Sequence, residues 1–317
     1  MSAPVLSIEG LSIRAGDRLL AEDVSLSIGP GEMVGLVGES GCGKSITALA
    51  ALRLLPPALR VAGGRIRIDG QDVLALGEAR LRRLRGGTAG MIFQEPMTSL
   101  NPVFTVGDQI AEVLEIHEAR PRADARARAA DLLALVGIPA PRDAVRRYPH
   151  QMSGGQRQRV MIAMALACSP SLLVADEPTT ALDVTVQAQI LALIDRLRRE
   201  RGMACLLITH DLGVVSEVCD RAAVMYAGRI VEEGPVDALF AAPRHRYTRA
   251  LLDTMPAMNP PGRPLPSIPG LVPPPGARGE GCTFAPRCPA PVDACRTRRP
   301  PLEGDGPHRA ACWNPAA

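Results

Sequence analysis

The chain has 317 residues, of which 46% are hydrophobic, 22% charged and 3% aromatic, and its formal net charge is +3 at pH 7. This size suits two domains, or one α/β domain with an appendage, and the apolar content is ample for a sizeable core. So small a charge excess does not by itself indicate nucleic-acid binding, and so few aromatic residues argue against base-stacking platforms for single strands.

Three strands rich in Val, Ile and Leu are predicted at the start of the chain, at Val5 to Arg14, Leu20 to Ile28 and Met33 to Val37. A helix is predicted from Ser45 to Leu55. Between the third strand and this helix lies Gly38-Glu39-Ser40-Gly41-Cys42-Gly43-Lys44-Ser45, which fits the pattern G-x-x-x-x-G-K-[ST]. In this context, backbone N–H groups and the helix N-terminus can converge on phosphate oxygens. The sequence therefore predicts a phosphate-binding loop.

Lys44 is the single lysine of the chain, since the other 35 of its 36 basic Lys and Arg residues are arginines. A compact ammonium fits a tight cradle around a phosphate, whereas the wide planar guanidinium does not. We expect Lys44 to reach the β- and γ-phosphates and Ser45 to ligate Mg²⁺. The plainer interpretation is an Arg-rich composition with one stray lysine.

The middle of the chain alternates strands and helices. Gly64 to Gly70 alternates apolar and polar residues between turn glycines, which predicts an exposed strand or hairpin arm. The longest uncharged run, 160–175, is too short to span a bilayer, and no signal peptide is visible, so we expect a cytosolic protein. The alternation of strands and helices along the chain predicts an α/β fold with a largely parallel sheet covered on both faces. The other expected elements are helices over 106–137 (broken near Arg120-Pro121), Gln156 to Ala167 and Val184 to Glu200, and strands at Leu172 to Ala175 and Ala204 to Thr209.

Two carboxylates, Asp176 and Glu177, follow the apolar strand at Leu172 to Ala175. An acidic pair in this position is able to hold Mg²⁺ and polarise a water molecule. We assign Asp176 to the metal and Glu177 to the water. Alone, such a pair is more often a solvated turn; the phosphate loop in the same chain favours the catalytic interpretation.

A second glycine-rich helix start, Ser153-Gly154-Gly155-Gln156, lies about twenty residues ahead of the acidic strand. It resembles the LSGGQ signature of ATP-binding cassette (ABC) proteins, with Met152 in place of Leu. This resemblance implies that ATP is sandwiched between the Lys44 loop of one chain and the Ser153 helix start of another.

The remaining cassette motifs follow in the family's order. By this resemblance, Gln94 is the Q-loop glutamine that senses Mg²⁺ and the attacking water, and His210 is the switch histidine at the γ-phosphate. Ala181-Leu182-Asp183 matches the D-loop at the dimer interface. The family's adenine-stacking aromatic is missing, since Ile13-Arg14-Ala15 stands there; either Arg14 covers the base as a cation–π partner or nothing stacks on it.

The stretch from Gln94 to Gln189 resembles, more narrowly, the ATP-binding subunits of bacterial oligopeptide/dipeptide importers and related nickel importers. The implied fold is an ABC-type P-loop nucleotide-binding domain over 1–250, with a RecA-like core, an antiparallel β subdomain and a helical subdomain at about 96–157. The segment 251–317 corresponds to the family's C-terminal extension, through Gly281-Cys282-Thr283-Phe284-Ala285-Pro286-Arg287-Cys288-Pro289.

The extension holds 16 of the 30 prolines, counted from Met255 onward, so we expect neither a sheet nor a long helix there. Its cysteines are spaced C-x5-C-x6-C-x16-C. Several members of the family hold an iron–sulfur cluster in this region. A [4Fe–4S] cluster, a tetrahedral Zn²⁺ and metal-free thiols all remain open, and His308 could replace one cysteine. The candidate ligands are Cys282, Cys288, Cys295 and Cys312.

The resemblance also implies partners. Two ATPase subunits, expected to be related but not identical chains, dock under two transmembrane permeases at the cytoplasmic face of the inner membrane, and an extracytoplasmic binding protein delivers the solute. Residues 95–110 would receive the permease, and no nucleic acid takes part. The alternatives are an importer of nickel or another small solute, a soluble cassette ATPase acting on DNA or the ribosome, and a metal-binding interaction protein with a vestigial ATPase.

Overall fold

The computed structural model describes residues 3–94, 99–180, 182–256, 266–304 and 306–316. The chain forms two compact units, each assembled from separate segments. The first unit comprises Met1–Leu6, Ile28–Glu32 and Ile68–Leu206; the second comprises Ser7–Ser27, Met33–Arg67 and Leu207–Ala317. The sequence-based boundary at residue 250 stays a prediction.

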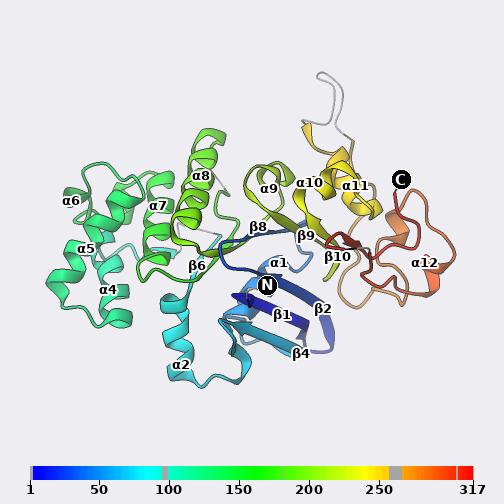
Figure 1. The fold of residues 1–317 in the computed structure, drawn as a ribbon, viewed down its shortest axis with the longest axis horizontal. Helices are drawn as coiled ribbons and strands as arrows, with labels where there is room; N and C mark the ends of the chain where they lie inside the picture. Colours follow the sequence, from blue (N-terminus) through cyan, green and yellow to red (C-terminus); the bar gives the residue numbers. More distant parts are fainter. Residues whose placement is uncertain (1–2, 95–98, 181, 257–265, 305, 317) are drawn as a thin grey trace. The chain divides into compact units, whose positions relative to one another are not determined.

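Two groups of strands build the second unit (Figure 1). One group has the order β2-β1-β4, and the other has the order β11-β10-β9-β3. β3 and β9 are parallel, and β9 and β10 form an antiparallel hairpin. β3 is buried along its whole length, which fits its continuous apolar sequence. The strands are β1 (Leu6–Ala15), β2 (Arg18–Ile28), β3 (Met33–Val37), β4 (Leu59–Ile68), β9 (Arg221–Tyr226), β10 (Arg229–Pro235) and β11 (Arg309–Ala310).

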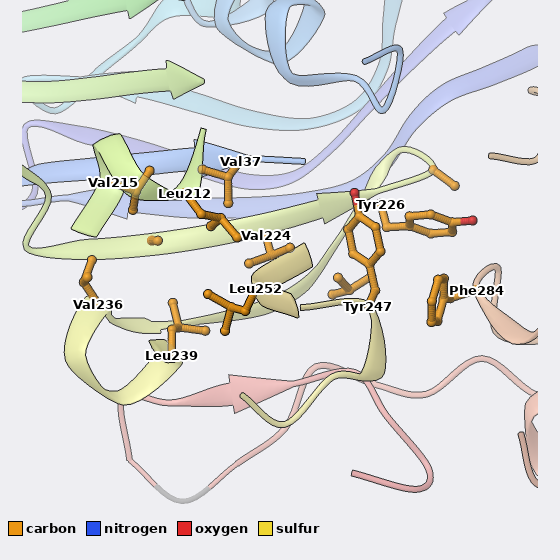
Figure 2. Packing of buried hydrophobic residues seen from close by; sticks show 13 residues of the cluster. Val37, Leu212, Val215, Val224, Tyr226, Val236, Leu239, Tyr247, Leu252 and Phe284 are labelled. Carbon is orange, nitrogen blue, oxygen red and sulfur yellow. The ribbon is translucent and has the colours of Figure 1, made fainter. Parts of the chain in front are cut away.

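Helices and an aromatic core complete the second unit. Tyr226, Tyr247 and Phe284 pack against one another, with ring centroids 4.5 to 5.4 Å apart, and Val37 at the end of β3 belongs to the same cluster (Figure 2). Because Phe284 is part of the extension, the extension shares a core with the strand that feeds the phosphate loop. The helices are α1 (Lys44–Ala51), α9 (Leu212–Val218), α10 (Val236–Ala241), α11 (Arg246–Asp253), a 3-10 turn at Ala285–Arg287 and α12 (Ala294–Thr297).

The first unit combines a parallel strand pair with a group of helices. β6 (Ala89–Ile92) pairs with β7 (Leu172–Asp176) in parallel. The helices α4 to α7 gather together (Figure 1). The other elements are β5 (Gln71–Asp72), a 3-10 turn at Val73–Ala75, α2 (Glu78–Arg83), a π-helical turn at Leu84–Thr88, α4 (Val106–Glu118), α5 (Arg122–Leu135), α6 (Pro141–Ala144), a 3-10 turn at Pro149–Gln151, α7 (Gly154–Ala165), α8 (Val184–Arg201) and the start of β8 (Ala204–Thr209).

Most expected elements are present, and the parallel strand pairs confirm the α/β class. Two expectations were wrong in detail. The first helix ends at Ala51 and not at Leu55, because Arg53 adopts a left-handed backbone (φ 51°) and two prolines follow. The extension does add a short strand, β11, whose Arg309 and Ala310 retain the N–H donors that a proline lacks. None of the described helices has both the length and the apolar character needed to cross a membrane.

Candidate nucleotide site

The phosphate loop links β3 to α1 in the second unit. Gly38 has φ 152°, and a Cβ there would lie 2.1 Å from the carbonyl oxygen of Met225 on β9. Gly43 has φ 111°, a left-handed conformation that favours glycine. Gly43 is also the N-cap of α1 and gives the helix no side-chain cap. The first N–H groups of a helix lack intrahelical partners, so this start can bind an anion.

Lys44 lies over this loop with only 5% of its surface exposed. Its Nζ donates to the carbonyl oxygens of Gly38 at 2.7 Å and Glu39 at 3.1 Å, and lies 3.8 Å from Cys42 Sγ. Burial raises the pKa of the Cys42 thiol, although the Lys44 charge acts in the opposite direction. The ammonium of the chain's single lysine is therefore held by backbone carbonyls of the loop.

Glu39, inside the loop, is held by two distant side chains. Its backbone N–H donates to the hydroxyl oxygen of Tyr247 at 2.9 Å. Its carboxylate accepts two hydrogen bonds from the guanidinium of Arg287, at 2.7 and 3.0 Å. Sequence reasoning placed Glu39 in the loop but missed both partners, because they follow it by 208 and 248 residues. An acidic residue in the loop and an arginine between two cysteines were the available signals.

The acidic residues lie in the first unit. Asp176 ends β7 and is 5% exposed, and Glu177 follows it in the left-handed region with φ 46°. Such a conformation costs a non-glycine residue free energy and is often found at functional sites. Glu177 Oε2 accepts from Gln94 Nε2 at 3.1 Å and from Thr180 Oγ1 at 2.9 Å. The structure thus joins the predicted Q-loop glutamine to the predicted catalytic acid, and adds Thr180, which sequence reasoning missed.

The second glycine-rich helix start belongs to the first unit and is closed by its own side chains. Ser153 Oγ accepts from the Gln156 N–H at 3.3 Å, and Gln156 Oε1 accepts from the Ser153 N–H at 3.2 Å. This reciprocal pair is a capping box. A Cβ on Gly155 would lie 2.8 Å from Val186 of α8, so glycine permits the close approach of α7 and α8.

The remaining predicted site residues are placed as follows. Asp183 caps α8 by accepting from the Val186 N–H at 2.9 Å, whereas Ala181 of the same motif lies outside the described residues. His210 is exposed directly after β8, and it lies in the second unit with the phosphate loop. Arg14 donates to the Asp17 carbonyl at 3.0 Å, within the turn between β1 and β2.

Two family models match the chain. Residues 21–180 match the ABC transporter family, and residues 231–295 match the oligopeptide/dipeptide transporter C-terminal region. A relative from Sinorhizobium fredii, named a probable peptide ABC transporter ATP-binding protein, is 55% identical over 294 residues, which is 92% of this chain and 88% of the relative.

This chain belongs to the ABC transporter ATP-binding family. A relative from Brucella abortus, named for peptide import, is 49% identical over 97% of this chain and 96% of its own length. The fold agrees with solved ABC cassettes. The cassette MJ0796, in a dimer bound to ADP and phosphate, has a TM-score of 0.65 at 28% identity, covering 73% of this chain and 98% of that one. CbiO1 of Clostridium perfringens has a TM-score of 0.66 at 27% identity, over 76% and 92% of the two chains. The expected ABC fold is confirmed, and the chain is an ATP-hydrolysing cassette.

The four extension cysteines gather around one small cavity, together with Trp313. Three of them also line an adjoining cavity of about 510 Å³. Burial raises the pKa of Cys282 to about 11 and also raises that of Cys312, so both thiols are protonated at neutral pH. Throughout the described segments, no group of three or more His, Cys, Asp or Glu side chains is arranged to hold a metal ion. The thiols converge without forming a ready ligand set.

His308, the other candidate ligand in the extension, does not line the cysteine cavity. Its Nε2 lies 2.7 Å from Oε1 of the buried Glu232. Glu232 also accepts from the backbone N–H groups of Arg244 and His245, at 2.6 and 2.9 Å. His308 therefore secures the extension to β10, and its expected role as a replacement cysteine ligand finds no support.

Proposed function

We propose that this chain is the ATP-hydrolysing subunit that energises the import of di- and oligopeptides across the cytoplasmic membrane. The observation that carries this proposal is the joint match to a cassette and to the oligopeptide/dipeptide C-terminal region in one chain. A relative named for peptide transport, at 55% identity, and one named for peptide import, at 49% identity, support it over 92% and 97% of the chain.

In the proposed hydrolysis, ATP and water give ADP and phosphate. Lys44 and backbone N–H groups of residues 40–45 bind the phosphates, whereas the Glu39 N–H is held by Tyr247. Ser45, Asp176 and Gln94 supply hydroxyl, carboxylate and amide oxygens, which are the hard donors that Mg²⁺ prefers. When bound, this ion neutralises charge on the phosphate oxygens.

The attacking water is assigned to Glu177, and the γ-phosphate contact to His210. Gln94, bonded to Glu177 at 3.1 Å, fixes the direction of the carboxylate. A second subunit completes the site with the Ser153 hydroxyl and the N–H groups of Gly154 and Gly155, at a helix start that Gln156 caps. Asp183 lies at the shared interface. The dimeric cassette with ADP and phosphate supports this two-chain arrangement.

Replacing the proposed base tests this assignment. Glu177→Gln keeps the shape of the side chain but cannot accept a proton, so ATP turnover should fall by about 10²- to 10⁴-fold. The variant should still bind MgATP and accumulate as a closed dimer, measured by light scattering. Glu78→Gln, at an exposed glutamate on α2, is the matched control. Undiminished turnover in Glu177→Gln would remove Glu177 as the base.

The proposed partners are a related second ATPase chain, two transmembrane permeases and an extracytoplasmic binding protein, which place the chain at the cytoplasmic face of the membrane. Part of the segment 95–110, proposed to receive the permease, exposes Val103 (70%) and Phe104 (54%). Gln109 organises this turn by bonding Asn101 and the Phe104 carbonyl. Residues 95–98 lie outside the described residues.

Co-purification tests this surface. Phe104→Ser should lower the recovery of permeases with the ATPase, whereas Ile116→Ser, at a more exposed residue of α4 (68%), should not. Equal recovery of permeases by both variants would contradict the proposed docking surface.

Uptake by the assembled transporter in vesicles tests the identity of the cargo. Accumulation of nickel without peptide would replace the peptide assignment.

For the extension, we propose that the four cysteines bind a [4Fe–4S] cluster, with Zn²⁺ and metal-free thiols as the alternatives. Their gathering around one cavity supports a shared ligand set of either kind, since four thiolates satisfy a [4Fe–4S] cluster or a tetrahedral Zn²⁺. The four thiols must move when a metal binds, because they are not already arranged as a ligand set. Anaerobically purified protein should contain iron and acid-labile sulfide, both lost in Cys288→Ser. Zinc alone, or no metal, would reject the cluster.

A further inference from the structure

Arg287 connects the C-terminal extension to the phosphate loop. Its side chain is 4% exposed, and each of its five N–H donors has an acceptor. Two donors bind the Glu39 carboxylate, one binds the Tyr226 hydroxyl at 3.3 Å, and two bind the carbonyl oxygens of Pro269 at 2.8 Å and Ile268 at 3.3 Å. The guanidinium also lies 5.7 Å from the Tyr226 ring centroid. Because each donor has an acceptor, the Arg287 guanidinium is held in one orientation.

The residues on either side of Arg287 in the chain hold its backbone in place. Arg287 ends a 3-10 turn at Ala285–Arg287, directly after Phe284, which is buried against Tyr226 and Tyr247 (Figure 2). Cys282 and Cys288, on either side, pack against the same cluster. The Arg287 side chain is therefore presented to Glu39 from a rigid platform.

The charge of Glu39 makes this contact relevant to nucleotide binding. Glu39 lies inside the loop, and its own carbonyl receives Lys44 Nζ. An unpaired carboxylate at this position would repel a triphosphate over a short distance. Pairing it with a buried guanidinium offsets that repulsion. With Glu39 paired to Arg287, the Lys44 ammonium is available to the phosphates.

We propose that Arg287 is a positioning residue for the phosphate loop, acting through Glu39, so that the extension sets the affinity of the cassette for MgATP. This inference rests on the proposed role of residues 38–45 in binding phosphate. It assigns the extension a part in nucleotide binding that is separate from any metal held by its cysteines.

The test uses the full-length chain and measures the dissociation constant of MgATP by calorimetry. Arg287→Met keeps the length of the side chain but removes the charge, and it should weaken MgATP binding by about tenfold. Adding Glu39→Gln to Arg287→Met should restore most of the affinity, because no unpaired carboxylate remains. Arg299→Met is the matched control, since Arg299 also joins the extension to a carboxylate, Glu22 on β2, but not to the loop.

Three results would overturn the inference. The first is unchanged affinity in Arg287→Met, and the second is equal loss in Arg299→Met. The third is a double variant as weak as Arg287→Met, which would assign Arg287 to packing alone. If Arg287→Met does not fold, Arg287→Lys replaces it: a lysine cannot make the two-point contact, so affinity should fall by a smaller factor, and unchanged affinity counts against the inference. A wild-type chain that binds no MgATP would overturn the proposed function as well.

Discussion

The two glycine-rich helix starts of this chain look alike in sequence but are stabilised differently. At Ser153, the cap is made by a residue three positions away, Gln156. At the phosphate loop, Gly43 offers no side-chain cap, and the loop is held by Tyr247 and Arg287, more than 200 residues away. The signature helix start is therefore locally encoded, whereas the phosphate loop depends on tertiary structure that includes the extension.

The largest expected effect concerns the loop's single lysine. Lys44→Arg, a mild change elsewhere in an arginine-rich chain, should abolish hydrolysis, with turnover lower by at least about 10²-fold. The wide guanidinium does not fit a cradle in which Nζ lies 2.7 Å from the Gly38 carbonyl. Steady-state ATPase assays measure this. The exposed residue Arg82 supplies a control through the reverse exchange, Arg82→Lys. Activity in Lys44→Arg close to wild type would contradict the proposed phosphate contact.

Tyr247→Phe tests the dependence of the loop on distant support. Removing the hydroxyl leaves the Glu39 N–H without the acceptor it has at 2.9 Å. We expect MgATP affinity to fall by about three- to tenfold, since an unsatisfied buried donor costs about 1 kcal/mol or more. Binding calorimetry measures the change, and Tyr148→Phe, at a half-exposed tyrosine of the first unit, is the control. Equal affinity in both variants would mean that the loop holds its shape alone.

Ser153→Ala tests the locally encoded start. Loss of the capping box should lower the free energy of unfolding by about 1 kcal/mol. Because the cap is local, MgATP binding by a single subunit should not change, while turnover by the dimer should fall. Denaturant unfolding and calorimetry separate the two effects. Ser153→Asn retains an acceptor for the cap and should recover the stability. A loss of single-subunit binding in Ser153→Ala would show that the two helix starts are not independent.

A pH dependence is also expected in the residues that support the loop. Burial lowers the pKa of His245 to about 3, and its Nδ1 accepts from the Tyr247 N–H at the start of α11. Because the unfolded histidine titrates near its ordinary value of 6.5, this neutral histidine favours the folded state above that pH. Its contribution is lost as the pH falls from 6.5 toward 3, by up to about 1.4 kcal/mol per pH unit.

His245→Asn isolates this contribution. Asparagine can cap α11 but does not titrate. The free energy of unfolding should therefore fall less steeply with acidification in His245→Asn than in wild type. Denaturant titrations between pH 7 and pH 5 measure the difference. Parallel curves for the two proteins would contradict the assignment to His245.

Local patterns along the chain were enough to predict the class of the fold and the order of the cassette motifs. Apolar runs such as Met33–Val37 and Leu172–Ala175 predicted buried strands, and glycine-rich, acidic and capping patterns predicted the functional loops, because these features are encoded by neighbouring residues. Three later elements, β9, β10 and α11, were not predicted. They have only 6, 7 and 8 residues, and runs this short carry little periodic signal.

Folding of the whole chain determines which distant groups meet. It brought Gln94 to Glu177, turned His308 toward Glu232, and joined Arg287 to Glu39. Each is a pairing of charged or polar side chains separated by at least 76 residues. Spacing along the chain carries no record of such pairings, because they form when burial removes water and each polar group must find a partner. The phosphate loop could be read from eight residues, but what holds it comes from the far end of the chain.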